Sequence, residues 1–254
     1  MKNYCLITGA SSGIGREFAR NLAKNYNLIL VARREDRLLE LSKELDTECV
    51  IKTLDVSKRE NILSFFEELK NYKIEVFINN AGFGDCGPFL ETDIDKELRM
   101  IDTNVTALYL LDKLILKKMK EDNIKGYVLN VGSIAGILRC GPYMSQYYAT
   151  KSYVVSLTLG IRRELKEEKT GIYIGCLCPG PVNTEFNKVA DVKFALKGIS
   201  PEKCAKYALK KMFKRKAIIV PSASIRFIIF FRRYLTINAL SRMVSKQQKR
   251  KIYE

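Results

Sequence analysis

Two side chains four residues apart, Tyr147 and Lys151, are well suited to acid–base chemistry in this 254-residue sequence. At this spacing they share one face of a helix, about one turn apart. A phenol ionises near pH ~10, and a nearby ammonium group favours the phenolate and lowers the phenol pKa. Tyr147 could then exchange a proton with a carbonyl or alcohol oxygen, which the Ser133 hydroxyl could hold. Such a pair also arises on helix surfaces by chance.

The sequence contains no histidine. This absence excludes catalytic schemes that pair His with Ser or Cys, and the commonest ligand sets for zinc and iron. We predict no metal site. Acid–base chemistry must use Tyr, Lys, Asp, Glu or Cys.

A glycine-rich turn follows the first apolar run, which begins at Tyr4, and leads into a helical pattern. Gly9, Gly13 and Gly15 lack a β-carbon, so the turn can be tight and its backbone can approach a pyrophosphate at the positive end of the helix. The pattern predicts a nucleotide phosphate site. A plain glycine-rich loop between a strand and a helix is the alternative.

The apolar run 27–32 ends in Ala32-Arg33-Arg34. A site for NAD usually places an acidic side chain here, for the ribose 2′-hydroxyl. A guanidinium group instead pairs with a phosphate. We therefore predict NADP(H), with Arg33 as the first contact and Arg16 as a helper. Alternatively, both arginines simply cap an exposed helix start.

Three more segments end predicted strands at the same sheet edge. Asp55 could accept a hydrogen bond from an adenine amino group, or cap the next helix. Asn79–Gly82 allows the main chain to pass close to a ribose, or forms an ordinary turn. Thr184, after a turn rich in proline, could cap a helix or bond the cofactor carboxamide.

Short apolar runs alternate with helical patterns along the sequence, which predicts one α/β domain over residues 1–221 with a parallel sheet. We expect strands from residue 4 and over 27–32, 49–54, 74–78, 127–133, 171–178 and 217–220. We expect helices over 35–45, 102–123, 147–168 and 200–214, and loops over 83–95 and 186–199, the second as a mobile lid.

In this order, the motifs resemble those of the short-chain dehydrogenase/reductase family, in its single-domain NADP-type members. They are Thr8-Gly9-x-x-x-Gly13-x-Gly15, Asn79-Asn80-Ala81-Gly82, Asn104, Ser133, Tyr147-x-x-x-Lys151 and Pro179-Gly180. The resemblance covers residues 1 to about 221. It implies a doubly wound, Rossmann-like parallel sheet with helices on both faces, and a homo-oligomer, usually a dimer or tetramer.

The resemblance also implies a catalytic tetrad of Asn104, Ser133, Tyr147 and Lys151, in which Asn104 supports a water-linked proton relay through Lys151. It further implies a set of cofactor-binding residues, which with the residues argued above are Gly9, Ser11, Ser12, Gly13, Ile14, Gly15, Arg33, Asp55, Val56, Asn80, Ala81, Gly82, Tyr147, Lys151, Pro179, Val182 and Thr184. Candidate pocket residues from the family's geometry are Phe83, Phe89, Ile134, Leu138, Pro181 and Phe194.

Two departures from the family pattern stand near Ser133. Gly132 replaces a Ser of many members, and the interval from Ser133 to Tyr147 is one residue longer than the commonest spacing. Neither removes a catalytic group. The longer interval is expected to reshape the pocket wall around Ile137, Leu138 and Cys140.

The basic charge is concentrated near the C-terminus. Residues 202–254 hold 15 Lys/Arg against two Glu, a net +13 of the +16 of the chain. Arginines interrupt the apolar residues of 224–244, which argues against a membrane-spanning helix. We predict a basic amphipathic segment over 222–254. It could pack on the domain or on another subunit, lie on an anionic membrane, or close over an apolar substrate. No motif supports nucleic-acid binding.

The first apolar run is short and lacks a cleavage-like region, so we expect no signal peptide and a cytoplasmic protein. Peripheral contact with the inner membrane surface stays open. Seven cysteines without a C-x-x-C pair fit reduced thiols.

We expect an NADP(H)-dependent oxidoreductase that interconverts a ketone and a secondary alcohol, with Tyr147 as general acid/base. A bulky apolar substrate, hydroxysteroid-like or a 3-oxoacyl thioester, fits the candidate pocket residues. The alternative is a non-catalytic NADP(H)-binding scaffold or sensor, docked to a membrane or partner through 222–254.

Overall fold

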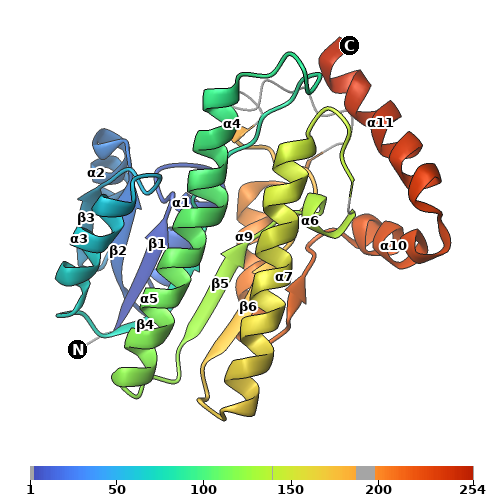
Figure 1. Ribbon diagram of the computed structural model, residues 1–254. Helices are drawn as coiled ribbons and strands as arrows, with labels where there is room; N and C mark the ends of the chain where they lie inside the picture. The colour runs from blue at the N-terminus through green and yellow to red at the C-terminus, as the bar shows by residue number, and fades with distance from the viewer. Residues whose placement is uncertain (1–2, 139, 187–197, 254) are drawn as a thin grey trace.

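The apolar runs of the sequence form one parallel sheet in the computed structural model, which describes residues 3–138, 140–186 and 198–253. Within those residues the sheet has seven strands in the order β3-β2-β1-β4-β5-β6-β7 (Figure 1). They are β1 (Tyr4–Thr8), β2 (Asn27–Ala32), β3 (Cys49–Thr53), β4 (Ile74–Asn79), β5 (Tyr127–Val131), β6 (Tyr173–Leu177) and β7 (Ile218–Ile219). This confirms the predicted doubly wound, Rossmann-like fold.

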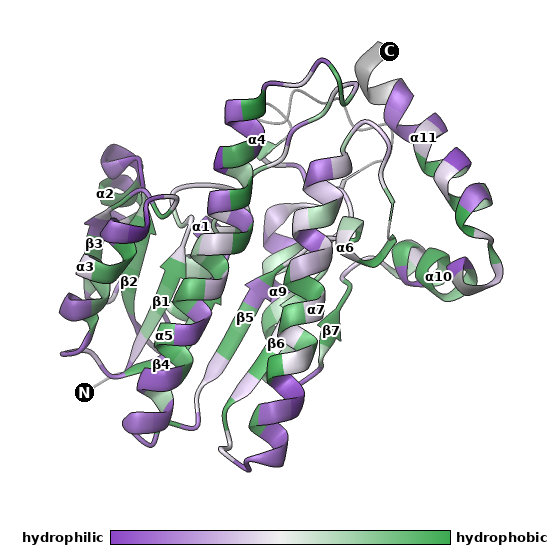
Figure 2. Cartoon of the chain, in the orientation of Figure 1, coloured by the Kyte–Doolittle hydropathy of each residue, from purple (hydrophilic) through white to green (hydrophobic). Residues whose placement is uncertain are grey.

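Helices cover both faces of the sheet (Figure 1). They are α1 (Gly13–Leu22), α2 (Glu35–Lys43), α3 (Arg59–Leu69), α4 (Ile94–Ile101), α5 (Leu108–Glu121), α6 (Ala135–Leu138), α7 (Ser145–Glu167), α9 (Pro201–Met212), α10 (Ala223–Phe231) and α11 (Ile237–Tyr253). Helices α1, α2 and α9 contribute to one core cluster with Ile7 and Leu30, while α3 and α5 contribute to another with Leu6 and Ile29. Neighbouring strand residues point to opposite faces, and both faces are covered, so most residues of the strands are apolar (Figure 2).

The chain order of the strands reverses between β1 and β4. In open sheets of this kind, the crevice at the carboxyl ends of the strands beside such a reversal is where ligands bind. Thr8 pairs with Val31 across β1 and β2, and Ile7 pairs with Ile78 across β1 and β4. The glycine-rich turn, the Arg33 segment and the Asn79–Gly82 segment therefore leave the sheet at one edge.

The long helix predicted over 102–123 begins eight residues earlier, at Ile94. The loop predicted over 83–95 therefore ends too late, because residues 94 and 95 are helical. Asp93 caps this helix, because its carboxylate accepts hydrogen bonds from the backbone N–H of Asp95 (2.8 Å) and Lys96 (3.2 Å). A π-helical segment, Asp102–Ala107, joins α4 to α5. It contains Asn104, whose side chain is fully buried.

The C-terminal segment is two helices that pack on the domain. Helix α10 buries Ile225 in a cluster with Val154 and Cys178, and α11 buries Leu240 and Val244 in a cluster with Tyr147 and Tyr148. A short 3₁₀ turn, Arg232–Tyr234, separates them. No helix in the described part of the chain is long and apolar enough to cross a bilayer.

A buried carboxylate lies between α5 and the sheet. Asp112 has no exposed surface and accepts hydrogen bonds from Asn79 Nδ2 (3.1 Å) and Asn130 Nδ2 (2.6 Å). Burial raises the pKa of Asp112 from 3.8 to about 7, against the lowering effect of the two amides. Asn130 Nδ2 also donates to Thr158 Oγ1 (2.9 Å), which ties this buried group to α7.

We expect Asp112→Asn to remove a pH dependence of stability. Between pH ~4 and ~7 the folded protein keeps the Asp112 proton and the unfolded chain loses it, so raising the pH through this window favours unfolding. Urea unfolding at several pH values in this range should show a flatter decline for Asp112→Asn than for the native protein. The exposed Asp36→Asn serves as the control. The same slope in both variants would assign the titration to another group.

Candidate active site

A cavity of about 490 Å³ lies at the carboxyl edge of the sheet. Most of the predicted cofactor-binding residues line it: Gly9, Ser11, Ser12, Gly13, Ile14, Arg33, Asp55, Val56, Asn80, Ala81, Gly82, Tyr147, Lys151, Pro179, Val182 and Thr184. Gly15 does not line it. A Cβ at Gly15 would lie 2.2 Å from the Gly9 carbonyl oxygen, so Gly15 allows α1 to approach the turn closely.

The glycine-rich turn forms a cradle at the N-terminus of α1. Gly9 and Gly13 have φ angles of +66° and +56°, which side chains disfavour. Ser12 is the N-cap residue, but its side chain makes no capping bond, so the first-turn N–H groups receive no side-chain acceptor from it. A Cβ at Gly13 would lie 3.1 Å from Thr184 Cγ2, inside the cradle. These features fit a dinucleotide pyrophosphate.

Asn80 ties β4 to the glycine-rich turn. Its Nδ2 donates to the carbonyl oxygens of Thr8 (2.9 Å) and Gly9 (3.2 Å). The Thr8 hydroxyl accepts from the backbone N–H of Asn80 (2.9 Å) and Ala81 (3.0 Å). The Asn80 amide donors are therefore used to hold the turn, and the segment Asn80–Gly82 runs along the cavity wall.

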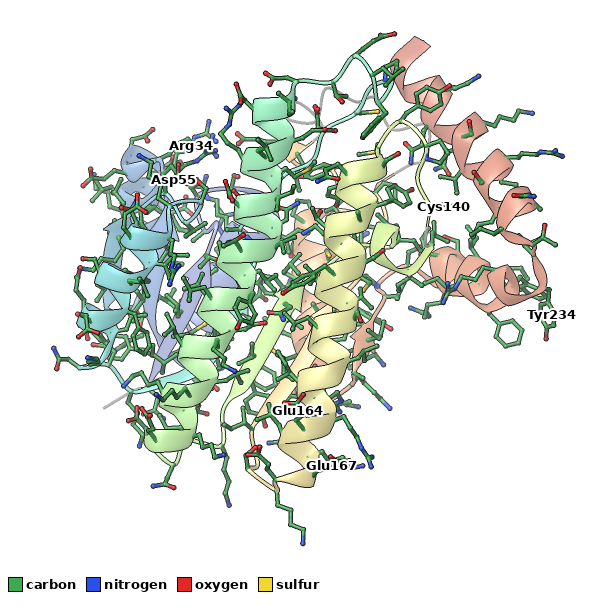
Figure 3. The ribbon with its side chains drawn as sticks, in the orientation of Figure 1. Arg34, Asp55, Cys140, Glu164, Glu167 and Tyr234 are labelled. Carbon is green, nitrogen blue, oxygen red and sulfur yellow. The ribbon has the colours of Figure 1, made fainter. Side chains whose placement is uncertain are left out.

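Two arginines line the cavity beyond β2. Arg33 is exposed there, while Arg34 donates to Glu185 Oε2 (2.9 Å) and also lies near Ser11 (Figure 3). Hydrogen bonds from Arg37 and Arg34 lower the pKa of Glu185 to about 2. This ion pair joins the loop after β6 to that after β2, which sequence reasoning missed. Arg16, predicted as a helper, lies outside the cavity.

Arg16 instead pairs with Glu40 of α2 (3.0 Å) and with Glu44, the C-cap residue of that helix.

Asp55 lines the cavity, and its Oδ1 accepts from Ser57 N (3.0 Å) and Ser57 Oγ (2.8 Å). Burial raises the pKa of Asp55, but these bonds and the charge of Arg33 outweigh it and hold the pKa below its usual value. The N-cap of α3 is Lys58, so Asp55 closes the turn before that helix without capping it.

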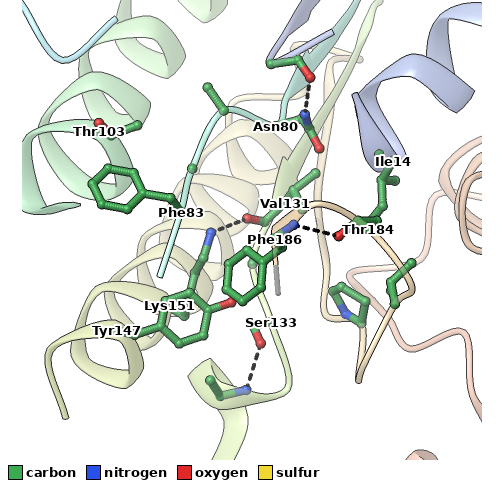
Figure 4. Close-up of a pocket in the computed structure, with 18 of the residues that line it drawn as sticks. Ile14, Asn80, Phe83, Thr103, Val131, Ser133, Tyr147, Lys151, Thr184 and Phe186 are labelled. Carbon is green, nitrogen blue, oxygen red and sulfur yellow. Dashed lines mark hydrogen bonds between the residues drawn. The ribbon is translucent and has the colours of Figure 1, made fainter. Parts of the chain in front are cut away.

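Tyr147 and Lys151 share one face of α7, as their spacing predicted. Lys151 Nζ lies 5.9 Å from the centre of the Tyr147 ring and donates to the carbonyl oxygen of Val131 (2.9 Å; Figure 4). Burial lowers the pKa of Lys151 to about 8. Burial raises the pKa of the Tyr147 phenol, and a hydrogen bond with Ser133 opposes the rise. Lys151 is not among the groups that lower this pKa, so the lowering expected from its ammonium is not found, and burial favours the protonated phenol.

Asn104 lies behind the cavity wall. Its Nδ2 donates to Phe83 O (2.8 Å) and Thr150 Oγ1 (3.2 Å), and its Oδ1 accepts from Phe83 N (3.1 Å). Asn104 thus fixes the backbone of the loop after β4. A Cβ at Gly82 would lie 2.8 Å from Asn104 Oδ1 and 3.3 Å from Lys151 Nζ. The two polar groups therefore both contact the backbone at Gly82, where a side chain would not fit.

The end of the cavity next to Tyr147 is apolar. Phe83, Ile134, Leu138 and Pro181 line it as predicted. Phe89 does not, because its side chain is 65% exposed elsewhere, and Phe194 lies outside the described residues. The sequence reading missed several lining residues, which are Met144, Tyr148, Phe186, Ile225, Ile228, Gln247 and Gln248. Four of these come from α10 and α11, where closure over a substrate was an open alternative.

Gly132, the departure from the family pattern, has a packing reason. A Cβ there would lie 2.7 Å from Cys176 Sγ, so the neighbouring strand leaves no room for a larger residue. Of the pocket wall predicted around Ile137, Leu138 and Cys140, Leu138 lines the cavity and the other two do not. In the part of the chain that the structure describes, no cluster of Cys, Asp and Glu could hold a metal ion.

Among the described residues, Gln248 is the strongly buried polar side chain that α11 contributes to the apolar end of the cavity. It is 2% exposed, and its Nε2 donates to Tyr148 Oη (2.9 Å). Its Oε1 has no partner among the described residues. That oxygen has almost no accessible surface, so Gln248 ties α11 to α7 rather than presenting an open acceptor to the cavity.

Comparison with known proteins agrees with this geometry. The family model for short chain dehydrogenases matches residues 3–193. An NADP-dependent 3-hydroxy acid dehydrogenase of Schizosaccharomyces pombe is 35% identical over 235 residues, covering 85% of this chain and 88% of that protein. A very-long-chain 3-oxoacyl-CoA reductase of Vanderwaltozyma polyspora is 36% identical over 185 residues, 67% of this chain and 53% of that protein. The match thus spans about half of that reductase.

A solved structure has the same architecture. The short-chain dehydrogenase from Sphingobium yanoikuyae in complex with NADPH superposes with a TM-score of 0.80 at 28% identity, over 90% of this chain and 92% of that one. The family match covers about three quarters of the sequence and includes Tyr147, Lys151, Ser133 and the glycine-rich turn. The chain therefore belongs to the short-chain dehydrogenase/reductase family of oxidoreductases.

Proposed function

We propose that this protein is an NADP(H)-dependent oxidoreductase that interconverts a ketone and a secondary alcohol on a bulky, apolar substrate. The observation that carries the proposal is a continuous cavity. It has the glycine cradle and Arg33 at one end, and Tyr147, Ser133 and Lys151 beside an apolar chamber at the other. A nicotinamide cofactor, when bound, supplies or accepts the hydride.

The residues of the chain provide the proton and hold the reacting oxygen. Ser133 and Tyr147 both line the chamber, so their hydroxyls can both donate to one carbonyl oxygen. In reduction, the Tyr147 phenol gives its proton to that oxygen, and in oxidation the phenolate takes it from the alcohol. The Lys151 ammonium stabilises the phenolate in either direction, because it lies buried beside the ring.

NADP(H) is favoured over NAD(H) by charge. Arg33 is exposed at the cavity and, within the described residues, no carboxylate pairs with it at ion-pair distance. A guanidinium in this place suits a ribose 2′-phosphate. The S. pombe relative is named as NADP-dependent, and the S. yanoikuyae structure contains NADPH. These names support the same choice for this chain.

The substrate class follows from the chamber walls. Aromatic and aliphatic side chains from α6, α7, α10 and the loop after β4 surround the space next to Tyr147, which suits a steroid-like ketone or a 3-oxoacyl thioester. The 3-oxoacyl-CoA reductase relative supports the second class. The reacting carbonyl lies at Tyr147, and the remainder of the molecule extends toward α10 and α11.

The direct test is consumption of NADPH and of NADH with a panel of ketosteroids, 3-oxoacyl thioesters and small ketones. We expect NADPH to be oxidised with the bulky ketones and NADH to be a poorer donor. Bound NADPH with no turnover on any ketone would favour a non-catalytic scaffold. The four polar groups Asn104, Ser133, Tyr147 and Lys151 argue for catalysis, since cofactor binding alone does not require a proton donor in this place.

A further inference from the structure

Helices α10 and α11 and the turn between them expose apolar side chains, which we call the C-terminal apolar surface. It comprises Phe227, Phe230, Phe231, Tyr234, Leu235, Ile237 and Met243. Phe227, Phe230 and Tyr234 are each more than half exposed. The ring centres of Phe227 and Phe231 lie 4.4 Å apart, and those of Phe230 and Phe231 lie 5.2 Å apart. An exposed apolar patch of this kind marks an interaction site.

This surface remains after both helices have packed on the domain. Ile225 and Ile229 hold α10 on the domain, and Leu240 and Val244 hold α11. Figure 2 shows α10 as largely hydrophobic around its circumference, and Figure 3 places Tyr234 at its outer end. The aromatic rings of the C-terminal apolar surface therefore stay largely exposed although both helices are packed on the domain.

Charge identifies what the surface meets. Residues 222–253 contain eight Lys/Arg and no Asp/Glu. Arg226, Arg242, Lys246 and Lys249 are exposed on the two helices. A twofold contact between two copies of this surface would bring like charges together, which costs free energy, whereas an anionic lipid surface attracts them.

We propose that the C-terminal apolar surface docks the protein on bilayers that contain anionic phospholipid. Aromatic rings enter the headgroup boundary, and the long basic side chains reach the lipid phosphates. Binding of this kind lies in the plane of the membrane and requires no spanning helix. It does not depend on the proposed reaction.

Docking would also orient the cavity. Ile225 and Ile228 of α10, with Gln247 and Gln248 of α11, line its apolar end. The elements that meet the lipid are therefore the elements that close the substrate chamber. An apolar substrate dissolved in the bilayer would have a short path to Tyr147.

The test is flotation of the full chain with vesicles of phosphatidylcholine alone or mixed with phosphatidylglycerol. We expect binding to the mixed vesicles, little binding to the neutral ones, and release by added salt. The double variant Phe227→Ser/Phe230→Ser should weaken binding to the mixed vesicles about tenfold or more, since it removes two insertion residues and keeps every charge.

A matched control is Leu39→Ser/Leu63→Ser, which removes two partly exposed leucines from α2 and α3 and should bind as the native chain does. Circular dichroism and the unfolding temperature of each variant verify the fold. The proposal is overturned if mixed vesicles do not bind the native chain, or bind both double variants equally. It is also overturned if light scattering shows a native oligomer that Phe227→Ser/Phe230→Ser dissociates without any vesicle binding, because a second copy would then cover the surface.

Discussion

Replacing Tyr147 by Phe is expected to lower kcat for the best ketone at least ~100-fold and to leave the affinity for NADPH nearly unchanged. Proton transfer by a positioned side chain contributes about 10²–10⁴ in rate. The Tyr147 phenol lines the cavity together with Ser133, and Lys151 Nζ lies 5.9 Å from the centre of its ring. Removing only the phenol oxygen keeps the ring and its contact with Phe186, whose centre lies 5.5 Å away.

Steady-state rates with NADPH, together with a fluorescence titration of NADPH, measure both quantities. Tyr153→Phe is the matched control, because Tyr153 lies on the same helix with a partly exposed side chain away from the cavity. It should keep full activity. Normal turnover by Tyr147→Phe would contradict the assignment of the proton donor.

Replacing Arg33 by Ser is expected to raise the Kd for NADPH about 10- to 100-fold and to change that for NADH little. A hydrogen bond to a charged group is worth about 1.5–3 kcal/mol, and only NADPH carries the 2′-phosphate. Arg33 is the exposed arginine of the cavity that directly follows β2, since Arg34 is bound to Glu185 and Arg99 lies on α4.

The selectivity between the two cofactors is measured by titrating each into the native protein, Arg33→Ser and Arg16→Ser. Arg16 is the control, because Glu40 and Glu44 hold it away from the cavity. If Arg33→Ser weakened the binding of both cofactors equally, Arg33 would contact a group that they share, and another residue would bind the 2′-phosphate.

The strands and the inner half of the site could be predicted because they depend on local patterns. An apolar run followed by glycines, Asn or Arg marks the carboxyl end of a buried strand, and parallel strands bring such ends to one edge. Thr8, Asn80 and Arg33 thus fall together from the sequence pattern. The spacing of Tyr147 and Lys151 fixes their common helix face in the same way.

The outer half of the site depends on contacts between distant segments. Nothing near Gln248 in the sequence indicates that it reaches Tyr148, one hundred residues away. The family's geometry made Phe89 a candidate pocket residue, yet its side chain is 65% exposed and does not line the cavity. Arg34 could not be separated from Arg33 either, because its partner Glu185 lies in another loop.

The π-helical segment Asp102–Ala107 has a geometric consequence for the whole substrate side. It acts as an inserted residue in a helix that otherwise continues from Ile94 to Glu121, and one residue corresponds to a turn of about 100°. Met100, before the segment, packs in the cluster of Tyr147, whereas Leu111, after it, packs under the sheet. The insertion thus sets the rotational phase between two halves of one rod, so that a single helix serves both the rigid framework and the wall of the substrate chamber.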